Sequence, residues 1–138
     1  MNHRNFPIIL ASVVIVLAIL GCSGSETAPT VSNIRMTTDD TGETPTSSYA
    51  PADEFYVFAD MAGLQVGSVI QAKWYAVDAE GVEANSEINT SDYSVESGVN
   101  YVYFQLGTSD GSAWPPGSYR VELFLDGTKV GEQGFTVR

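Results

Sequence analysis

The chain has 138 residues and a formal net charge of −11, with 17 acidic residues against six basic ones. A surface this acidic repels the phosphate backbone of nucleic acids, so we expect no nucleic-acid partner. The length allows one domain with a single hydrophobic core, and we do not expect a second.

The first 21 residues have the pattern of a secretory signal peptide. Arg4 supplies the positive charge near the N-terminus, residues 6–20 form an apolar run, and Gly21 is the small residue before Cys22. The run is shorter than the roughly 20 apolar residues that a membrane-spanning helix needs. We therefore expect a cleaved signal over residues 1–21. A cleaved signal that leaves a free thiol and an uncleaved anchor are the alternatives.

The segment Ile19-Leu20-Gly21-Cys22 resembles the lipobox of bacterial lipoproteins. The resemblance implies that Cys22 carries a diacylglycerol and that the protein is extracytoplasmic, lipid-anchored to the cell membrane or the outer membrane. Because Cys22 is the only cysteine, no disulfide within the chain is possible, and packing has to stabilise the domain. Loss of Arg4 leaves five basic residues against 17 acidic ones, a charge of −12 that disfavours contact with anionic headgroups. The only expected membrane contact is therefore the lipid on Cys22.

After Cys22, residues 22–30 are expected to be a tether, and residues 31–138 form a domain in which apolar residues alternate with a period of two. A long loop is expected over residues 37–53, which are rich in Thr, Ser, Pro and Asp. Asp126-Gly127 predicts a type I′ hairpin turn. The strands at 54–61 and 69–77 are expected to be neighbours. The predicted strands cover residues 31–36, 54–61, 69–77, 87–95, 100–106, 119–125 and 129–138.

About seven short strands separated by turns predict an all-β fold, an antiparallel β-sandwich. Trp74 lies in the middle of a predicted strand and precedes Gly117-Ser118-Tyr119-Arg120-Val121. This pair resembles the core tryptophan and the Gly-x-Tyr-x-Cys strand of immunoglobulin domains. The resemblance implies an immunoglobulin-like sandwich in which Val121 and Val57 replace the disulfide, and in which the Tyr119 hydroxyl bonds to nearby backbone. Fold alone does not define function.

The residues that commonly carry catalysis are scarce. His3 is the only histidine and lies in the signal segment, which excludes zinc-type sites and histidine-dependent nucleophiles from the mature chain. Asp39, Asp40 and Glu43 lie in a polar loop with no apolar wall to raise a carboxyl pKa. We expect a protein that is not an enzyme and has no metal or cofactor. A calcium site and a hydrolase that uses only carboxylates are the weaker alternatives.

Strand alternation places several aromatic side chains opposite the expected core. Tyrosines give a large contact area at a small entropic cost, which suits binding surfaces. The alternatives are that these rings fill a half-exposed sheet, or that the loop at 37–53 covers them. Trp114 is expected to close one end of the sandwich. The candidate binding surface comprises Tyr56, Tyr75, Tyr101 and Tyr103, with Phe58 on the same expected face.

These features predict a membrane-anchored, extracytoplasmic lipoprotein that acts as a non-catalytic binding, adhesion or accessory module. Its partner is an unidentified protein or glycan. Two alternatives remain open, a carbohydrate-binding module that uses an exposed tyrosine face and a passive structural spacer. Exposed and coplanar rings would favour sugar binding, whereas covered rings would favour the spacer.

Overall fold

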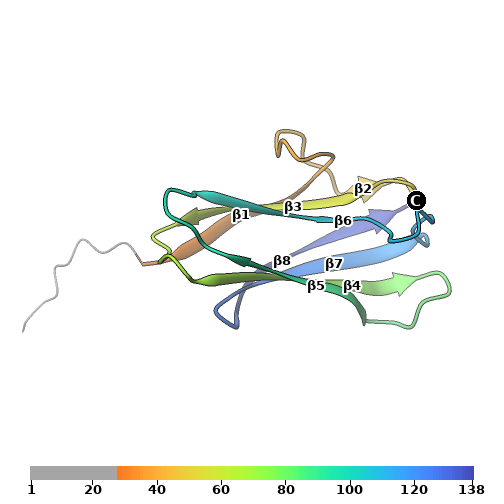
Figure 1. The fold of residues 1–138 in the computed structure, drawn as a ribbon. Coiled ribbons are helices and arrows are strands. Elements are labelled where there is room, and N and C mark those ends of the chain that lie inside the picture. The colour runs from red at the N-terminus through yellow and green to blue at the C-terminus, as the bar shows by residue number, and fades with distance from the viewer. Residues whose placement is uncertain (1–27) are drawn as a thin grey trace, which may run out of the picture.

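The computed structural model describes residues 28–138, which form eight strands (Figure 1). The predicted signal segment, the lipidation of Cys22 and most of the tether lie outside the described residues. Within residues 28–138, no helix is long and apolar enough to cross a membrane. The strands are β1 (Thr30–Thr37), β2 (Ser48–Tyr49), β3 (Phe55–Ala62), β4 (Val69–Ala79), β5 (Ser86–Ser94), β6 (Tyr101–Leu106), β7 (Gly117–Leu125) and β8 (Thr128–Val137).

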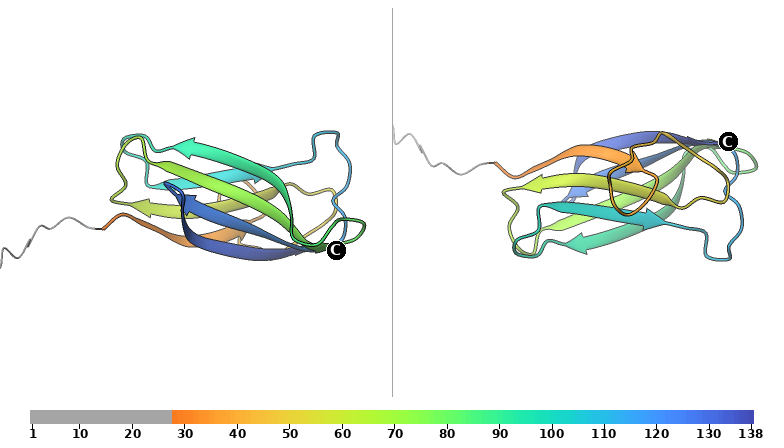
Figure 2. Two further views of the ribbon diagram at one scale, coloured as in Figure 1. Left: turned by 90° about the horizontal axis from the view of Figure 1, so that it is seen from below. Right: turned by 90° about the horizontal axis from the view of Figure 1, so that it is seen from above.

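The strands form two sheets that pack face to face, as predicted for an immunoglobulin-like sandwich (Figure 2). One sheet has the order β1-β3-β6 and the other has the order β2-β8-β7-β4-β5. Neighbouring strands are antiparallel except for β2, which is parallel to β8.

The prediction that β3 and β4 are neighbours is wrong, because they lie in different sheets. Residues 63–68 connect them, and Gly63 and Gly67 in this connection have φ of 69° and 92°. The connection carries the chain across the sandwich, so that the apolar faces of the two strands meet in the core rather than lying side by side.

The predicted loop at 37–53 contains one element that the sequence analysis missed. Ser48 and Tyr49 form β2, and Tyr49 is 3% exposed. Its hydroxyl donates a hydrogen bond of 2.6 Å to the carbonyl oxygen of Thr37, and its ring lies 5.0 Å from that of Phe55 between centroids. One buried aromatic side chain therefore fixes this polar segment to the sandwich.

The core agrees with the immunoglobulin resemblance. Trp74 is fully buried, and Val57 and Val121 fill the core from β3 and β7, one strand in each sheet. The Tyr119 hydroxyl donates a hydrogen bond of 2.6 Å to the carbonyl oxygen of Pro115. Aliphatic packing and this tyrosine contact are therefore present where the resemblance implied them.

The predicted hairpin turn and the predicted end closure are also confirmed. Asp126 and Gly127, which connect β7 to β8, both have positive φ, of 47° and 85°. The Trp114 ring stacks on Phe55 with 4.6 Å between centroids, and Phe55 lies in the core. The loop that contains Trp114 thus covers one end of the core.

Candidate functional site

Three aromatic rings stack on the outer face of the three-stranded sheet. Phe58 on β3 lies opposite Tyr103 on β6, and their ring centroids are 5.0 Å apart at an interplanar angle of 15°. Tyr101, two residues earlier on β6, stacks on the same phenylalanine at 6.2 Å and 16°. Alternation places all three rings on one face, because residues two apart on a strand point the same way. We call Phe58, Tyr101 and Tyr103 the aromatic row.

The two tyrosines of the aromatic row face solvent and the phenylalanine does not. Tyr101 is 51% exposed and Tyr103 is 40% exposed, whereas Phe58 is only 2% exposed. The loop between β1 and β2 covers Phe58, and a Cβ atom on Gly42 would lie only 2.8 Å from its ring. The alternative that this loop covers the aromatic face is therefore true of Phe58 but not of the two tyrosines.

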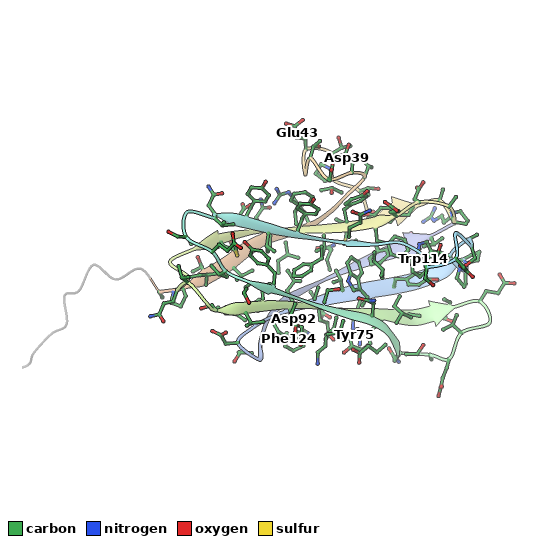
Figure 3. All side chains as sticks on the ribbon, in the orientation of Figure 1. Asp39, Glu43, Tyr75, Asp92, Trp114 and Phe124 are labelled. Atoms are coloured by element: carbon green, nitrogen blue, oxygen red, sulfur yellow. The ribbon has the colours of Figure 1, made fainter. Side chains whose placement is uncertain are left out.

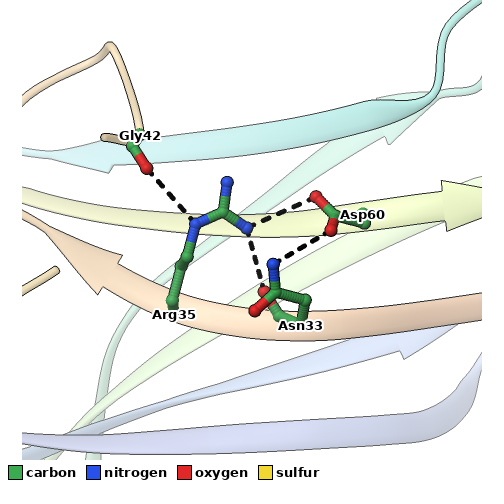
Figure 4. Close-up of polar contacts among 4 residues, drawn as sticks. All are labelled: Asn33, Arg35, Gly42 and Asp60. Carbon is green, nitrogen blue, oxygen red and sulfur yellow. Dashed lines mark hydrogen bonds and ion pairs between the residues drawn. The ribbon is translucent and has the colours of Figure 1, made fainter. Parts of the chain in front are cut away.

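A polar network holds the loop and the aromatic row together (Figure 4). Arg35 Nη1 lies 3.3 Å from Asp60 Oδ1, and Arg35 Nε donates to the carbonyl oxygen of Gly42 at 3.3 Å. The guanidinium carbon is 5.4 Å from the centroid of the Phe58 ring. Asn33 Nδ2 also donates to Asp60 Oδ2 at 3.0 Å, and the hydrogen bonds from Asn33 and then Arg35 lower the pKa of the Asp60 carboxyl.

Hollows flank Tyr101 on two sides. On one side, a polar hollow of about 470 Å³ brings Arg35, Asp60 and Asn100 next to the ring. Along β6, a more apolar hollow of about 330 Å³ includes Tyr93, Tyr101 and Tyr103. Tyr101 thus offers a partner an aromatic ring between polar groups and apolar groups, a combination that is common in small-ligand sites.

Tyr56 shares this face but is less available. It is half-buried on β3, and its hydroxyl donates a hydrogen bond of 2.9 Å to Glu54 Oε2. The Gln105 side chain donates to the same carboxylate oxygen. Burial, with a contribution from the bond to Glu54, raises the pKa of Tyr56 to about 12. Its polar end is therefore already engaged within the sheet.

Tyr75 does not lie on the same surface as Tyr56, Tyr101 and Tyr103. The prediction that it shares a binding surface with them is therefore wrong. It lies on β4 in the five-stranded sheet and points outward on the opposite side of the sandwich from the loop that carries Asp39 (Figure 3). Alternation correctly placed Tyr75 outside the core. Because the chain crosses from one sheet to the other between β3 and β4, the outward-facing residues of β4 lie on the opposite outer face of the sandwich from those of β3. The Arg120 guanidinium carbon lies 4.5 Å from the centroid of its ring.

The side chains of Asp39 and Glu43 are solvated, as the sequence analysis expected. Asp39 and Glu43 lie exposed in the loop above the three-stranded sheet (Figure 3). Hydrogen bonds from Thr41 lower the pKa of the Asp39 carboxyl, which keeps it ionised. Among residues 28–138, no three side chains of the His, Cys, Asp or Glu type are grouped closely enough to hold a metal ion.

The sequence analysis missed Arg35 and Asp60. The signal for Arg35 is its rarity, because it is one of six basic residues and lies next to apolar strand positions. Its pairing with Asp60 depends on the register between β1 and β3, which contains an irregularity between Ser32 and Arg35. Residue patterns do not reveal such a register.

These features define an immunoglobulin-like β-sandwich with an exposed aromatic row on its smaller sheet. No family model and no curated protein matches the chain. Among solved structures, it is similar to an immunoglobulin-like protein from Pseudomonas aeruginosa, with a TM-score of 0.59 and 14% identity over 83% of this chain and 100% of that chain.

Two enzymes contain a similar domain as part of a longer chain. The alkylpurine DNA glycosylase AlkC of Pseudomonas fluorescens matches with a TM-score of 0.52 and 12% identity, over 80% of this chain and 30% of that chain. A β-glucosidase from Listeria innocua matches with a TM-score of 0.51 and 14% identity, over 80% of this chain and 16% of that chain. At these identities the likeness shows the fold alone.

Proposed function

We propose that the protein is a lipoprotein, anchored through Cys22 on the extracytoplasmic side, whose immunoglobulin-like domain is a non-catalytic binding or accessory module for a protein partner. The chain enters the domain at β1, and the C-terminus lies at the opposite end of the sandwich (Figure 1). A tether at one end leaves both outer faces of the sandwich accessible.

The observation that carries this proposal is the aromatic row. Tyr101 and Tyr103 are exposed side by side, and each packs one ring face on the buried Phe58. Because the two tyrosine rings are already ordered, their side chains lose little conformational entropy when a partner covers them. Tyrosine is also enriched at protein interfaces, where it supplies much of the binding energy.

The test compares binding with stability for the double variant Tyr101→Ser, Tyr103→Ser. We expect the free energy of unfolding to fall by about 1–3 kcal/mol, because each ring stacks on Phe58, and we expect the domain to stay folded. Retention of solubilised envelope proteins by the immobilised protein is expected to fall sharply. The matched control is Tyr75→Ser, which removes a tyrosine from the opposite sheet and should retain the partner. Equal retention by all three proteins would instead favour a passive spacer.

A glycan partner is the second candidate, and the polar hollow beside Tyr101 favours it. The hollow places the charged groups of Arg35 and Asp60 and the amide of Asn100 next to an aromatic ring. In ligand sites, a few polar groups beside an apolar wall fix the orientation of the ligand. A panel of immobilised glycans tests this candidate. Binding that both Tyr101→Ser and Asn100→Ala weaken, with no protein retained, would favour the glycan.

The membrane anchor has its own test. Cys22→Ser should abolish acylation and cleavage at this position, because the serine hydroxyl is a poor replacement for the thiolate. Mass spectrometry of the protein from membranes measures both. A wild-type N-terminus at any residue other than Cys22, or an unmodified Cys22, would contradict the lipoprotein proposal.

A further inference from the structure

The two open sheets have four edge strands, and three of them carry features that prevent pairing with another chain. Proteins protect such edges with irregularities, charges or very short strands. β1 has an irregular register near Asn33, which has a φ of 50°; β2 has two residues; and β5 carries Glu87 and Asp92. β6 has none of these features, because its sequence Tyr-Val-Tyr-Phe-Gln-Leu is uncharged and its register with β3 is regular.

The backbone groups of β6 that point away from β3 can be identified from the ladder. The Met61 amide donates to the carbonyl oxygen of Asn100 at 2.8 Å, so this pair is hydrogen-bonded. Hydrogen-bonded and non-hydrogen-bonded pairs alternate along an antiparallel ladder. Val102 is therefore bonded to β3, whereas the N–H and C=O groups of Tyr101, Tyr103 and Gln105 point outward from the edge.

We propose that a second copy of this chain pairs with this edge, β6 against β6 and antiparallel, with Tyr103 opposite Tyr103 of the other copy. The same register places Tyr101 opposite Gln105 and allows about six backbone hydrogen bonds. The three-stranded sheet of each copy then continues into that of the other. The proposal goes beyond the binding function because it uses the backbone of β6 rather than the tyrosine rings.

Among the edge strands long enough to pair, β6 is the one in which two copies would bring no charged residues together. Each chain has a net charge of −11, so most surfaces of two copies repel each other. β6 lets two copies approach with no charged residue in the paired strands. Asp60, which lies opposite Tyr101 in the ladder, is already paired with Arg35. The apolar hollow that includes Tyr93 and Tyr103 also lies along β6, and a second strand would cover part of it.

The expected dimer is weak in dilute solution. Pairing of one short strand covers less area than the roughly 1,200–2,000 Å² of a stable interface. The anchoring through Cys22 proposed above would hold both copies on one membrane, raise their effective concentration and favour the pair without any new contact. The dimer brings four exposed tyrosines onto one continuous sheet face.

Cysteine cross-linking tests the pairing and its register in the full chain carrying Cys22→Ser, with oxidised glutathione as the oxidant. In this background, Tyr103→Cys should give a disulfide-linked dimer on a non-reducing denaturing gel. The two Cα atoms at the symmetry axis would be about 5.5 Å apart, which a disulfide can span. The matched control is Gln105→Cys, whose two Cα atoms would be about 14 Å apart and should not link. Combining Tyr101→Cys with Gln105→Cys should restore linking.

Salt supplies a second readout. The yield of linked Tyr103→Cys dimer should rise several-fold between about 10 mM and 300 mM NaCl, because screening reduces the repulsion between two acidic chains. Absence of a linked dimer, or equal linking of Tyr103→Cys and Gln105→Cys, would overturn the proposal. Either result would leave the partner-binding proposal intact, because that proposal is tested on rings that face away from the edge.

Discussion

At the scale of single residues, Tyr119 connects one end of the sandwich to its core. The side chain is 3% exposed, and its hydroxyl bonds to the Pro115 carbonyl in the loop that also carries Trp114. Tyr119→Phe leaves that carbonyl without its partner and should lower the free energy of unfolding by about 1–2 kcal/mol. Equilibrium urea unfolding measures this. Tyr101→Phe is the control and should change stability by much less, because Tyr101 is exposed.

Trp74 is the largest fully buried side chain, and its Nε1 has no hydrogen-bond partner among the described residues. Trp74→Ala should cost about 3–5 kcal/mol through the cavity that it leaves. Trp74→Phe should cost less, because it keeps part of the volume and removes the unpaired N–H group. The urea midpoints of the two variants give the comparison. An unchanged midpoint for Trp74→Ala would contradict its place at the centre of the core.

Tyr49 makes stability depend on alkaline pH. Burial raises the pKa of its hydroxyl to about 12, against about 10 in an unfolded chain. The folded state then holds the proton more tightly than the unfolded state does. The contribution of this group to the free energy of unfolding is therefore fully present below pH 10 and is lost as the pH rises from 10 towards 12. The loss should approach about 1.4 kcal/mol per pH unit for this group. Urea unfolding between about pH 9 and 11.5 measures the slope, and Tyr49→Phe should reduce it.

At the scale of elements, regular alternation predicted the long strands well, because a period of two identifies a strand with one buried face. Alternation did not predict two features. β2 has only two residues and forms through parallel pairing with β8, which is far away in the sequence. Alternation also does not say which sheet a strand joins, and this is why Tyr75 was placed with Tyr101. The exposed pair Tyr101 and Tyr103 was predicted because β6 alternates regularly.

The loop over Phe58 depends on Gly42, which has a φ of 73° and lies against the ring. Gly42→Ala should destabilise the protein through backbone strain and through the contact of the new Cβ with Phe58. The matched control is Gly81→Ala, because Gly81 has a φ of 74° and open space around it. We expect Gly42→Ala to cost about 1–2 kcal/mol more than the control. Equal urea midpoints for the two variants would show that the loop over Phe58 can shift to accept the new Cβ atom at no cost in stability.

At the scale of the whole molecule, acidic residues far outnumber the basic residues that could pair with them, by 17 to six. Ion pairs among the described residues gather in two places, at Arg35 with Asp60 and around Arg120 and Lys129 on the five-stranded sheet. Partly exposed pairs of this kind contribute about 0–1 kcal/mol each. Most carboxylates therefore contribute repulsion to the folded state rather than attraction.

Salt should consequently stabilise this protein. Raising NaCl from about 10 mM to 300 mM shortens the screening length from about 30 Å to about 6 Å, which weakens both the repulsion and the ion pairs. Repulsion between carboxylates outweighs the attraction within the ion pairs because the charge is so unbalanced. We therefore expect the free energy of unfolding to rise by an amount on the order of 1 kcal/mol, which urea unfolding measures as a higher midpoint. Glu43→Gln combined with Glu83→Gln removes two exposed charges and should make the rise smaller. A midpoint that falls with salt would show that the clusters at Arg35 and Lys129 outweigh the repulsion.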